Sequence, residues 1–127
     1  MPWQMQYVAA SQTLVVVPSG RVSDYEVKQL TGEAIAVLKE NQAKRVLGDC
    51  RGIQSAPSLA AVYWLVQDYA HCGVPTETRI ALVHSPKRHA VEIAQFYETV
   101  CLNRHYDARI FESIKAAETW LGSVQTA

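Results

Sequence analysis

The feature that most constrains the fold is a regular alternation of short apolar runs with longer amphipathic segments. The short runs are rich in Val, Ile and Leu, as strands are, and the longer segments repeat apolar residues at helical spacing. Their order is β-β-α-β-α-β-α-β-α, and strands that alternate with helices in this way form right-handed crossovers. The sequence therefore predicts an α/β fold: an N-terminal β-hairpin followed by βα repeats, with a mostly parallel five-stranded sheet and four helices.

The first two strands are expected to form the antiparallel hairpin. Met5 and Tyr7 alternate with glutamines, which is typical of a half-exposed edge strand. Residues 10–12 can turn the chain, and the β-branched run Thr13–Val17 would be the second, buried strand. Pro18, which is followed by Ser-Gly, is expected to end that strand.

The first two helices have clear boundary signals. Ser23 and Glu26 have the spacing of a capping box, so the first helix is expected over Asp24–Asn41. Pro57 is expected at or near the first turn of the second helix, because a proline there removes no intrahelical hydrogen bond. Gly73 is expected just beyond the end of that helix, where the chain turns left-handed.

The last two helices are predicted from similar signals. Ser85 would cap the third helix, and Pro86 would begin it. Ser113 would cap the fourth helix, which Gly122 would end. Both helices carry an apolar face that would pack on the sheet.

Three buried parallel strands complete the predicted sheet: Lys44–Asp49, Arg79–Val83 and Asp107–Phe111. A loop is expected over Arg51–Ala56, and residues 123–127 are expected to form a frayed tail. The whole chain, residues 1–127, is expected to be a single domain, because its length suits one core.

The composition argues against bulk attraction to nucleic acid or to an anionic membrane. The 12 basic residues balance the 12 acidic ones, so the chain has no net field for a polyanion. The apolar run Leu14–Val17 is far too short to span a bilayer, and the N-terminus lacks the basic start of a signal peptide. The three cysteines, Cys50, Cys72 and Cys101, are widely spaced and odd in number, which fits free thiols in a reducing cytoplasm.

Four stretches carry a resemblance to a known family. Gly20–Ser23 leads from a strand into a capped helix, and the strand Arg45–Arg51 ends in Asp-Cys-Arg. Arg79–Val83 is followed closely by Ser-Pro, and Arg109–Leu121 is a strand plus an Ala-x-x-Trp-Leu helix. In this order and spacing the chain resembles the SpoIIAA-like proteins, the family of anti-sigma-factor antagonists and STAS domains. It is most similar to their small stand-alone bacterial members.

The resemblance implies a non-enzymatic regulatory module that acts through a protein partner or a second copy of itself. Antagonists of this family carry Asp-Ser-Ser-Gly after the central strand, with a phosphorylated serine at the start of the next helix. This motif is absent here, although Ser55 and Ser58 lie in the corresponding region and are the candidate phosphorylation sites. His105 stands where relatives often have glycine, and histidine tolerates a left-handed conformation better than most residues.

A small anionic ligand is a second expectation from the residues. The carboxyl ends of parallel strands meet at one edge, where α/β sheets bind ligands. Lys87 and Arg88 would lie in the first turn of a helix, beside free backbone N–H groups that attract anions. The alternative is that these are solvated surface residues. The candidates for anion binding are Arg21, Asp49, Arg51, His84, Ser85, Lys87 and Arg88.

Catalysis and metal binding find little support. Asp49 and Arg51 could grip a ligand or act in a reaction, but they could equally serve the loop as a cap and an ion pair. Cys50 lacks an assured histidine base, and a lone cysteine is more often a small buried hydrophobe. The four histidines do not recur at metal spacing, so no metal and no cofactor are expected.

The second helix has more aromatic residues than one buried face requires. Tyr63, Trp64 and Tyr69 would therefore lie either in the core or at an interface with a partner or a second copy of the chain. Two functions follow. The first is the regulatory interaction module, and the alternative is a small-molecule carrier or sensor for an acidic or lipid-like ligand at the carboxyl edge of the sheet. An enzyme using Asp49, Cys50 or His84 is a third, weaker hypothesis.

Overall fold

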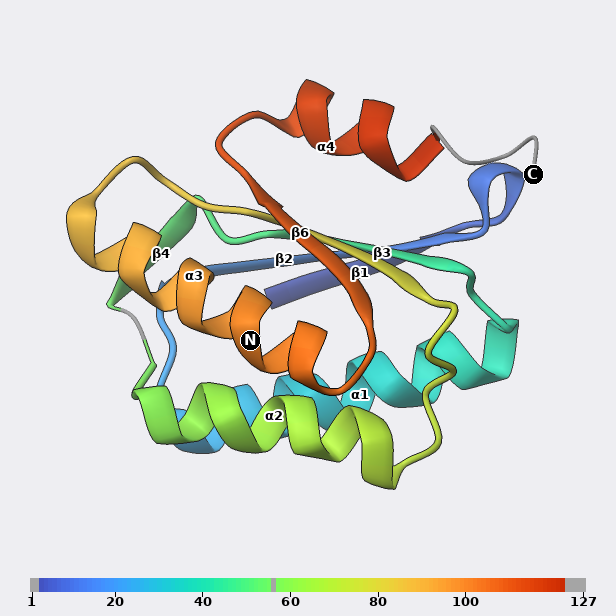
Figure 1. Cartoon of the computed structure of the whole chain (residues 1–127), viewed down its shortest axis with the longest axis horizontal. Coiled ribbons are helices and arrows are strands. Elements are labelled where there is room, and N and C mark those ends of the chain that lie inside the picture. Colours follow the sequence, from blue (N-terminus) through green and yellow to red (C-terminus); the bar gives the residue numbers. More distant parts are fainter. Residues whose placement is uncertain (1–2, 56, 123–127) are drawn as a thin grey trace.

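The computed structural model describes residues 3–55 and 57–122, so the predicted tail at 123–127 and residue 56 of the predicted loop lie outside it. The described residues form a sheet with helices on both faces (Figure 1). The strands are β1 (Trp3–Val8), β2 (Thr13–Arg21), β3 (Arg45–Asp49), β4 (Gly52–Ser55), β5 (Arg79–Val83) and β6 (Asp107–Phe111). The helices are α1 (Asp24–Asn41), α2 (Leu59–His71), α3 (Arg88–Asn103) and α4 (Ile114–Gly122), and a short 3-10 turn (Ala9–Ser11) joins β1 to β2.

The sheet confirms the predicted α/β class. Its order is β1-β2-β3-β5-β6, with β4 paired to β2. Only β1 and β2 pair in the antiparallel sense, and the other pairs among the described strands are parallel. The N-terminal hairpin is therefore confirmed, and so is the mostly parallel sheet.

The predicted number of strands was wrong, because the sheet has six strands rather than five. The segment expected to be a loop contains β4, which pairs with Ser19–Arg21 at the end of β2. Pro18 therefore does not end β2. The first part of β2, Thr13–Val16, pairs with β3, and Pro18 lies between the two ladders, where its missing N–H interrupts neither.

Two helix boundaries follow their predicted signals. In the capping box of α1, the hydroxyl of Ser23 accepts from the Glu26 N–H at 3.1 Å, and the Glu26 carboxylate accepts from the Ser23 N–H at 3.0 Å. Beyond α2, Gly73 has φ +79°, and the Val74 N–H donates to the Tyr69 carbonyl at 2.9 Å. This is a Schellman ending, so the role predicted for Gly73 is confirmed.

The starts of α2 and α3 differ in how well they were predicted. Pro57 lies near the first turn of α2, as expected: it precedes the cap Ser58, whose hydroxyl accepts the Ala61 N–H at 3.0 Å and fixes the start one residue after Ser58. α3 begins at Arg88 rather than at Pro86, and its N-cap is Lys87, which makes no side-chain capping bond. The chain is still extended at Lys87, so the predicted cap at Ser85 comes too early.

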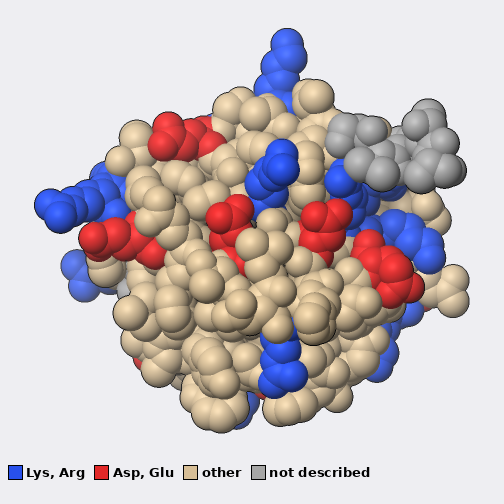
Figure 2. Space-filling model, in the orientation of Figure 1, with Lys and Arg blue, Asp and Glu red and all other residues tan. Residues whose placement is uncertain are grey.

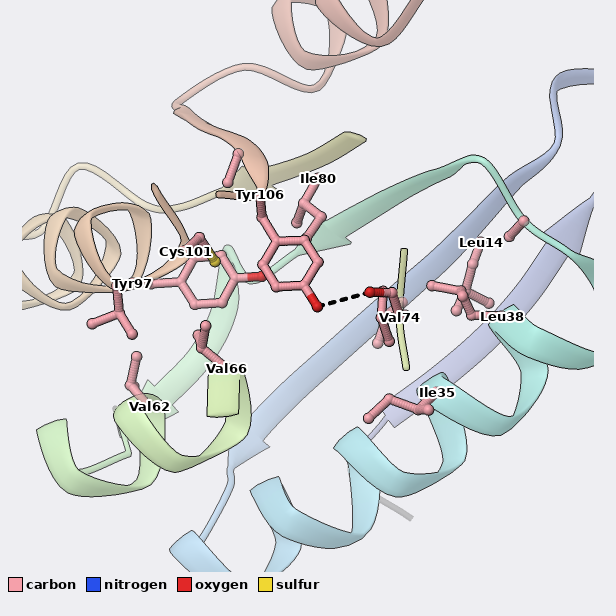
Figure 3. Packing of buried hydrophobic residues seen from close by; sticks show 14 residues of the cluster. Leu14, Ile35, Leu38, Val62, Val66, Val74, Ile80, Tyr97, Cys101 and Tyr106 are labelled. Atoms are coloured by element: carbon pink, nitrogen blue, oxygen red, sulfur yellow. Dashed lines mark hydrogen bonds between the residues drawn. The ribbon is translucent and has the colours of Figure 1, made fainter. Parts of the chain in front are cut away.

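The two faces of the sheet are covered unequally. In Figure 1, α1 and α2 lie below the sheet and α4 above it, and α3 packs on the same face as α1 and α2. The larger core lies on that face, where the Tyr106 hydroxyl donates to the Val74 carbonyl at 2.9 Å (Figure 3). The smaller core lies under α4 and comprises Leu47, Ala81, Val83, Ala117 and Leu121.

Candidate functional site

The strand period places one set of side chains under α1, α2 and α3. Successive residues of a strand point to opposite faces, and Val16, Gly48 and Leu82 are neighbours in register across β2, β3 and β5. Two positions further along, at the carboxyl ends of β3 and β5, come Cys50 and His84. The backbone joins these two ends, because the Cys50 N–H donates to the carbonyl of the residue before His84 at 2.8 Å.

A cavity of ≈ 230 Å³ lies between this part of the sheet and the three helices. Its wall is mainly apolar and includes Val16, Leu30, Val46, Leu65, Ile80 and Ile93. At the carboxyl edge the wall also includes Gln54, Lys87 and His89, whose side chains are exposed, so the cavity reaches the surface there. Sequence reasoning placed a ligand site at this edge but did not foresee an apolar cavity behind it.

Most polar side chains in the buried part of the wall already have protein partners. The Thr31 hydroxyl donates to the Val27 carbonyl at 2.7 Å. The hydroxyls of Tyr69 and Tyr97 bond to each other at 2.9 Å. The interior of the cavity therefore offers little to a polar group.

Tyr69 packs against this core, so of the two positions expected for it, core or interface, the core is the one that the structure shows. Its ring contacts Tyr97 and Tyr106 edge-on, with centroids 6.5 and 5.9 Å apart. Burial raises the pKa of the Tyr69 hydroxyl well above its ordinary value of 10.0. Tyr69 follows the buried stripe of α2, one turn after Val66 and Leu65.

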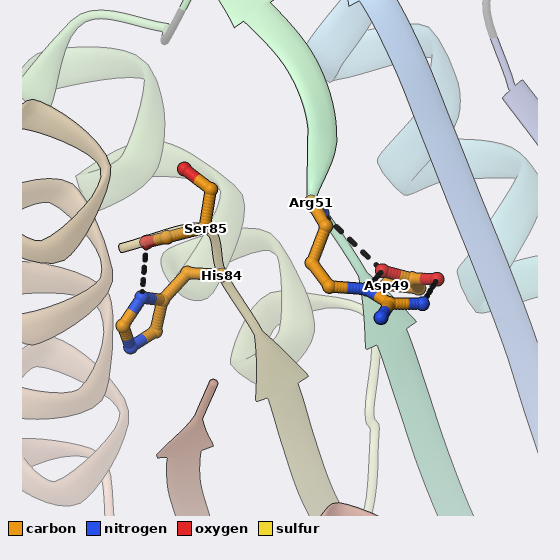
Figure 4. Close-up of polar contacts among 4 residues, drawn as sticks. All are labelled: Asp49, Arg51, His84 and Ser85. Carbon is orange, nitrogen blue, oxygen red and sulfur yellow. Dashed lines mark hydrogen bonds and ion pairs between the residues drawn. The ribbon is translucent and has the colours of Figure 1, made fainter. Parts of the chain in front are cut away.

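His84 is the buried polar residue at the mouth of the cavity. It is 6% exposed, and its Nδ1 lies 2.8 Å from the Ser85 carbonyl oxygen (Figure 4). A carbonyl oxygen only accepts, so Nδ1 carries the hydrogen and Nε2 of the neutral ring has a lone pair. Nε2 makes no hydrogen bond to any residue in the described ranges.

Asp49 and Arg51 bind each other rather than converging on His84. The guanidinium donates to both carboxylate oxygens at 2.9 Å (Figure 4), and the Arg51 N–H also donates to Asp49 at 3.3 Å. These hydrogen bonds hold the pKa of the Asp49 carboxyl below its ordinary value of 3.8, against the opposing effect of partial burial. Of the predicted readings, the cap and ion pair at the loop therefore fits this geometry.

The other predicted cations are not gathered into one cluster. Arg88 lies 3.8 Å from Glu92 in a highly exposed pair, and Arg21 lies exposed at the end of β2. Lys87 makes no ion pair within the part of the chain that the structure describes. On the face seen in Figure 2, acidic and basic side chains are interspersed. Lys87 is thus the cation that lines the cavity without an acidic partner.

The described residues form neither an activated thiol at Cys50 nor a cluster of metal ligands. Burial, with a smaller contribution from Asp49, raises the pKa of the Cys50 thiol to about 12, so the thiol stays protonated at neutral pH. Among residues 3–55 and 57–122, no group of three His, Cys, Asp or Glu side chains could hold a metal ion. No helix of those residues is both long and apolar enough to cross a bilayer.

The two candidate serines have different surroundings. Ser55 is exposed in β4, opposite Arg21 in the ladder. The hydroxyl of Ser58 donates to the Asp24 carboxylate at 2.7 Å, and the Ser58 N–H donates to the same carboxylate at 3.0 Å. Both bonds lower the pKa of Asp24 from its ordinary value of 3.8, the backbone bond more than the side-chain bond. Ser58 and Asp24 therefore tie the start of α2 to the start of α1.

The outer side of α2 exposes large apolar side chains. Leu59, Tyr63 and Trp64 are 51%, 43% and 60% exposed, and the two rings meet edge-on with centroids 5.3 Å apart. Trp64 also borders a hollow of ≈ 340 Å³ between α1 and α2, whose wall includes Asp24 and Ser58. This surface, Leu59, Tyr63, Trp64 and the adjoining hollow, is called the α2 surface below.

No protein-family model matches the chain, and no curated protein matches its sequence. Solved structures do resemble it. The anti-sigma factor antagonist SpoIIAA in its unphosphorylated form is 13% identical over 98% of this chain and 99% of its own, with a TM-score of 0.63. A protein of the DUF3478 family with a SpoIIAA-like fold from Shewanella loihica PV-4 is 16% identical, covering 94% of this chain and 93% of its own, with a TM-score of 0.60. The phosphorylated form of the Bacillus cell fate determinant SpoIIAA is 14% identical, covering 93% of this chain and 98% of its own, with a TM-score of 0.59.

These likenesses confirm the fold. The chain is an α/β protein whose hairpin, parallel strands and helices follow one known arrangement. That arrangement is the SpoIIAA-like fold expected from the sequence. At such low identities a shared fold carries no function with it, so function has to be argued from the sites.

Proposed function

We propose that this protein is a non-enzymatic interaction module that binds a protein partner through the α2 surface. The observation that supports the proposal is the exposure of Leu59, Tyr63 and Trp64 on neighbouring turns of one helix. Single exposed apolar residues are ordinary, but adjacent aromatic rings are what protein interfaces concentrate at their centres. The hollow beside Trp64 would receive a side chain of the partner.

The chemistry of the carboxyl edge favours binding over catalysis. The Cys50 thiol stays protonated, and the Asp49 carboxylate is engaged by Arg51. The structural relatives include an anti-sigma factor antagonist, a protein whose described role is to oppose another protein. A regulatory role in the bacterial cytoplasm is the corresponding proposal for this chain.

Ser58 is the residue at which phosphorylation would act on this surface. A phosphate at the N-terminus of a helix is favoured by the helix dipole. Here it would also replace the hydroxyl that bonds Asp24 and would bring two negative groups together. The modification would therefore separate the starts of α1 and α2 and reshape the hollow.

The test uses site-specific photocrosslinking in the source organism, with the crosslinker at position 64 and, as a control, at position 25. Tyr25 is a suitable control because it is 71% exposed on α1. A partner captured only from position 64 is then purified and titrated against the wild type, the double variant Tyr63→Ser plus Trp64→Ser, and Tyr25→Ser. The double variant is expected to lose affinity by at least about tenfold, as loss of interface aromatics does.

An unchanged affinity for the identified partner in the double variant would overturn the proposal. A second copy of the chain is the alternative occupant of the α2 surface. In that case sedimentation velocity would show a dimer of the wild type that the double variant does not form.

A second candidate function is a small-molecule carrier or sensor, favoured by the cavity beneath the helices. An apolar cavity that reaches the surface beside a few polar groups is the usual form of a ligand site. The α2 surface and the cavity are formed largely by different residues, although Val27 and Leu65 border both the cavity and the hollow beside Trp64.

A further inference from the structure

The central strand leaves a space in the sheet surface. Gly48 lies in the middle of a hydrogen-bonded ladder, with partners in both β2 and β5. A Cβ built there would meet only the Ala81 carbonyl oxygen, at 3.9 Å. Glycine weakens a strand, and within one it often marks the close approach of a ligand. Packing between the described elements therefore leaves room for a side chain at this position, which lines the cavity.

The cavity has room for a small organic molecule and not for a polypeptide. A dry apolar cavity of about 150 Å³ binds benzene, and this one measures ≈ 230 Å³. An α-helix is about 10 Å across and could not enter. An alkyl chain or an aromatic ring system with roughly ten heavy atoms is the size that fits between these limits.

The polar groups of the cavity are concentrated at one end. Deep in the wall, Tyr69 and Tyr97 satisfy each other, which leaves that end to apolar atoms. At the mouth, Nε2 of His84 has no partner within the described residues, and Lys87 has no acid. α3 also begins here without a side-chain cap or an acidic residue in its first turn, so its free N–H groups add positive potential.

We infer that the cavity binds an apolar monocarboxylate, with its tail against Gly48 and its carboxyl group between His84 and Lys87. This inference specifies the ligand of the carrier or sensor function proposed above and rests on it. A carboxylate suits both partners when Nε2 takes up a proton from solvent as the ligand binds, because the imidazolium then donates to one carboxylate oxygen and Lys87 donates to the other. An alcohol with the same tail could donate to Nε2 but would bring no charge to Lys87.

The ligand is tested by isothermal titration calorimetry with octanoate and octan-1-ol. Octanoate is expected to bind the wild type at least about tenfold more tightly than octan-1-ol, the difference typical of a hydrogen bond to a charged group. Lys87→Gln should reduce octanoate affinity to that of octan-1-ol. Lys115→Gln, which removes a cation from α4 on the other face, should leave both affinities unchanged.

The position of the tail is tested with Gly48→Val, which fills the space with a residue that favours strands. It should bind neither molecule, while its urea midpoint stays at or above that of the wild type. The milder Gly48→Ala provides the same comparison should the valine variant fail to fold. Amide NMR shifts of residue 48 and its neighbours should respond to octanoate in the wild type.

The possible outcomes distinguish a failure of the carboxylate assignment from a failure of the carrier or sensor function. Octanoate that fails to bind the wild type, or binds Gly48→Val equally well, overturns the inference. Equal affinities for octanoate and octan-1-ol, lost together in Gly48→Val, overturn the carboxylate assignment and leave the carrier or sensor function standing. Absence of binding by both molecules and by a wider panel of apolar compounds removes that function as well.

Discussion

The two faces of the sheet are built from the same alternating strands, yet only one of them is closely packed. Under α4, Ala117 is fully buried against β3 and β5, and Trp120 closes the edge beneath the guanidinium of Arg79, 4.3 Å from the ring centroid. On the other face three helices cover the same strands, and a cavity of ≈ 230 Å³ remains. The side with more covering helices is the side with unfilled space.

The difference between the faces shows that covering a sheet with more helices does not guarantee closer packing against it. One short helix can settle onto a sheet until its small residues touch the strands. Three helices must also pack on one another, and a space remains between them and the small residues Gly48 and Cys50. Interiors normally fill to crystal-like density, which is why a space of this size supports the proposal of a ligand there.

The largest expected effect is on the closely packed face. Trp120→Ala removes the ring that lies beneath Arg79 and that contacts Phe111 at 5.7 Å between centroids. We expect the free energy of unfolding to fall by about 2–4 kcal/mol, somewhat below the loss for a fully buried tryptophan. Urea denaturation measures it, with Tyr63→Ala as an exposed control that should change stability by about 0.5 kcal/mol or less. A loss for Trp120→Ala no larger than that of the control would remove the contrast between the faces.

The contrast is sharpened by adding atoms to each face in turn. Ala117→Leu should overpack the α4 face and lower the free energy of unfolding by about 1–3 kcal/mol. Gly48→Ala adds a methyl group toward the cavity and should raise it by about 0.5–1 kcal/mol, because a strand glycine is replaced without a clash. Thermal and urea unfolding of both variants measure the two values, and changes of equal sign would show that the faces tolerate added atoms alike.

The caps of α2 and α4 give a smaller comparison between the faces. Ser58 and Ser113 each accept a backbone N–H at the start of their helix. Replacement by alanine should cost about 1 kcal/mol in each case. The loss should be larger for Ser58→Ala, because its hydroxyl also bonds Asp24. When Asp24 is also replaced by asparagine, the extra stability lost in Ser58→Ala should shrink. An extra loss that persists in that background would not come from the bond between Ser58 and Asp24.

The smallest effect concerns the pH dependence of the bond between α1 and α2. The pKa of Asp24 is lowered in the folded chain, so its carboxylate stabilises the fold above the ordinary value of 3.8, and this contribution is lost as the pH falls below it. The wild type should therefore be slightly more stable than Asp24→Asn near neutral pH, and this advantage should shrink as the pH falls below 3.8. Urea midpoints at neutral pH and at a series of pH values below 3.8 measure it. An advantage that is independent of pH would mean that the charge of Asp24 plays no part.

Most of the fold could be predicted because its signals are local. The capping box at Ser23 fixed α1, and the apolar runs at Arg79–Val83 and Asp107–Phe111 gave β5 and β6 with their observed bounds. β4 was missed because its residues carry one apolar side chain and its stability comes from a distant partner, the end of β2. Pro18 suggested a strand end, although it only separates two ladders.

The candidate site was predicted less completely. Lys87 and His84 do line a common mouth, whereas Asp49 and Arg51 satisfy each other. The cavity itself could not be foreseen, because it is a small difference between the spacing of helices and the volume of the side chains between them. The one available signal was Gly48, a glycine inside an otherwise apolar strand.

The division of β2 between two partners has a consequence for local opening. β4 is held in register at only a few positions, with an irregularity at Arg21, and Gly52, Gln54 and Ser55 are exposed. Segments with little buried surface open at a lower free energy than the central ladder does. Amide hydrogens of β4 should therefore exchange with solvent faster than those of β3 and β5. We therefore expect a slowly exchanging central sheet next to a readily exchanging β4, whose Gln54 lines the cavity where it reaches the surface.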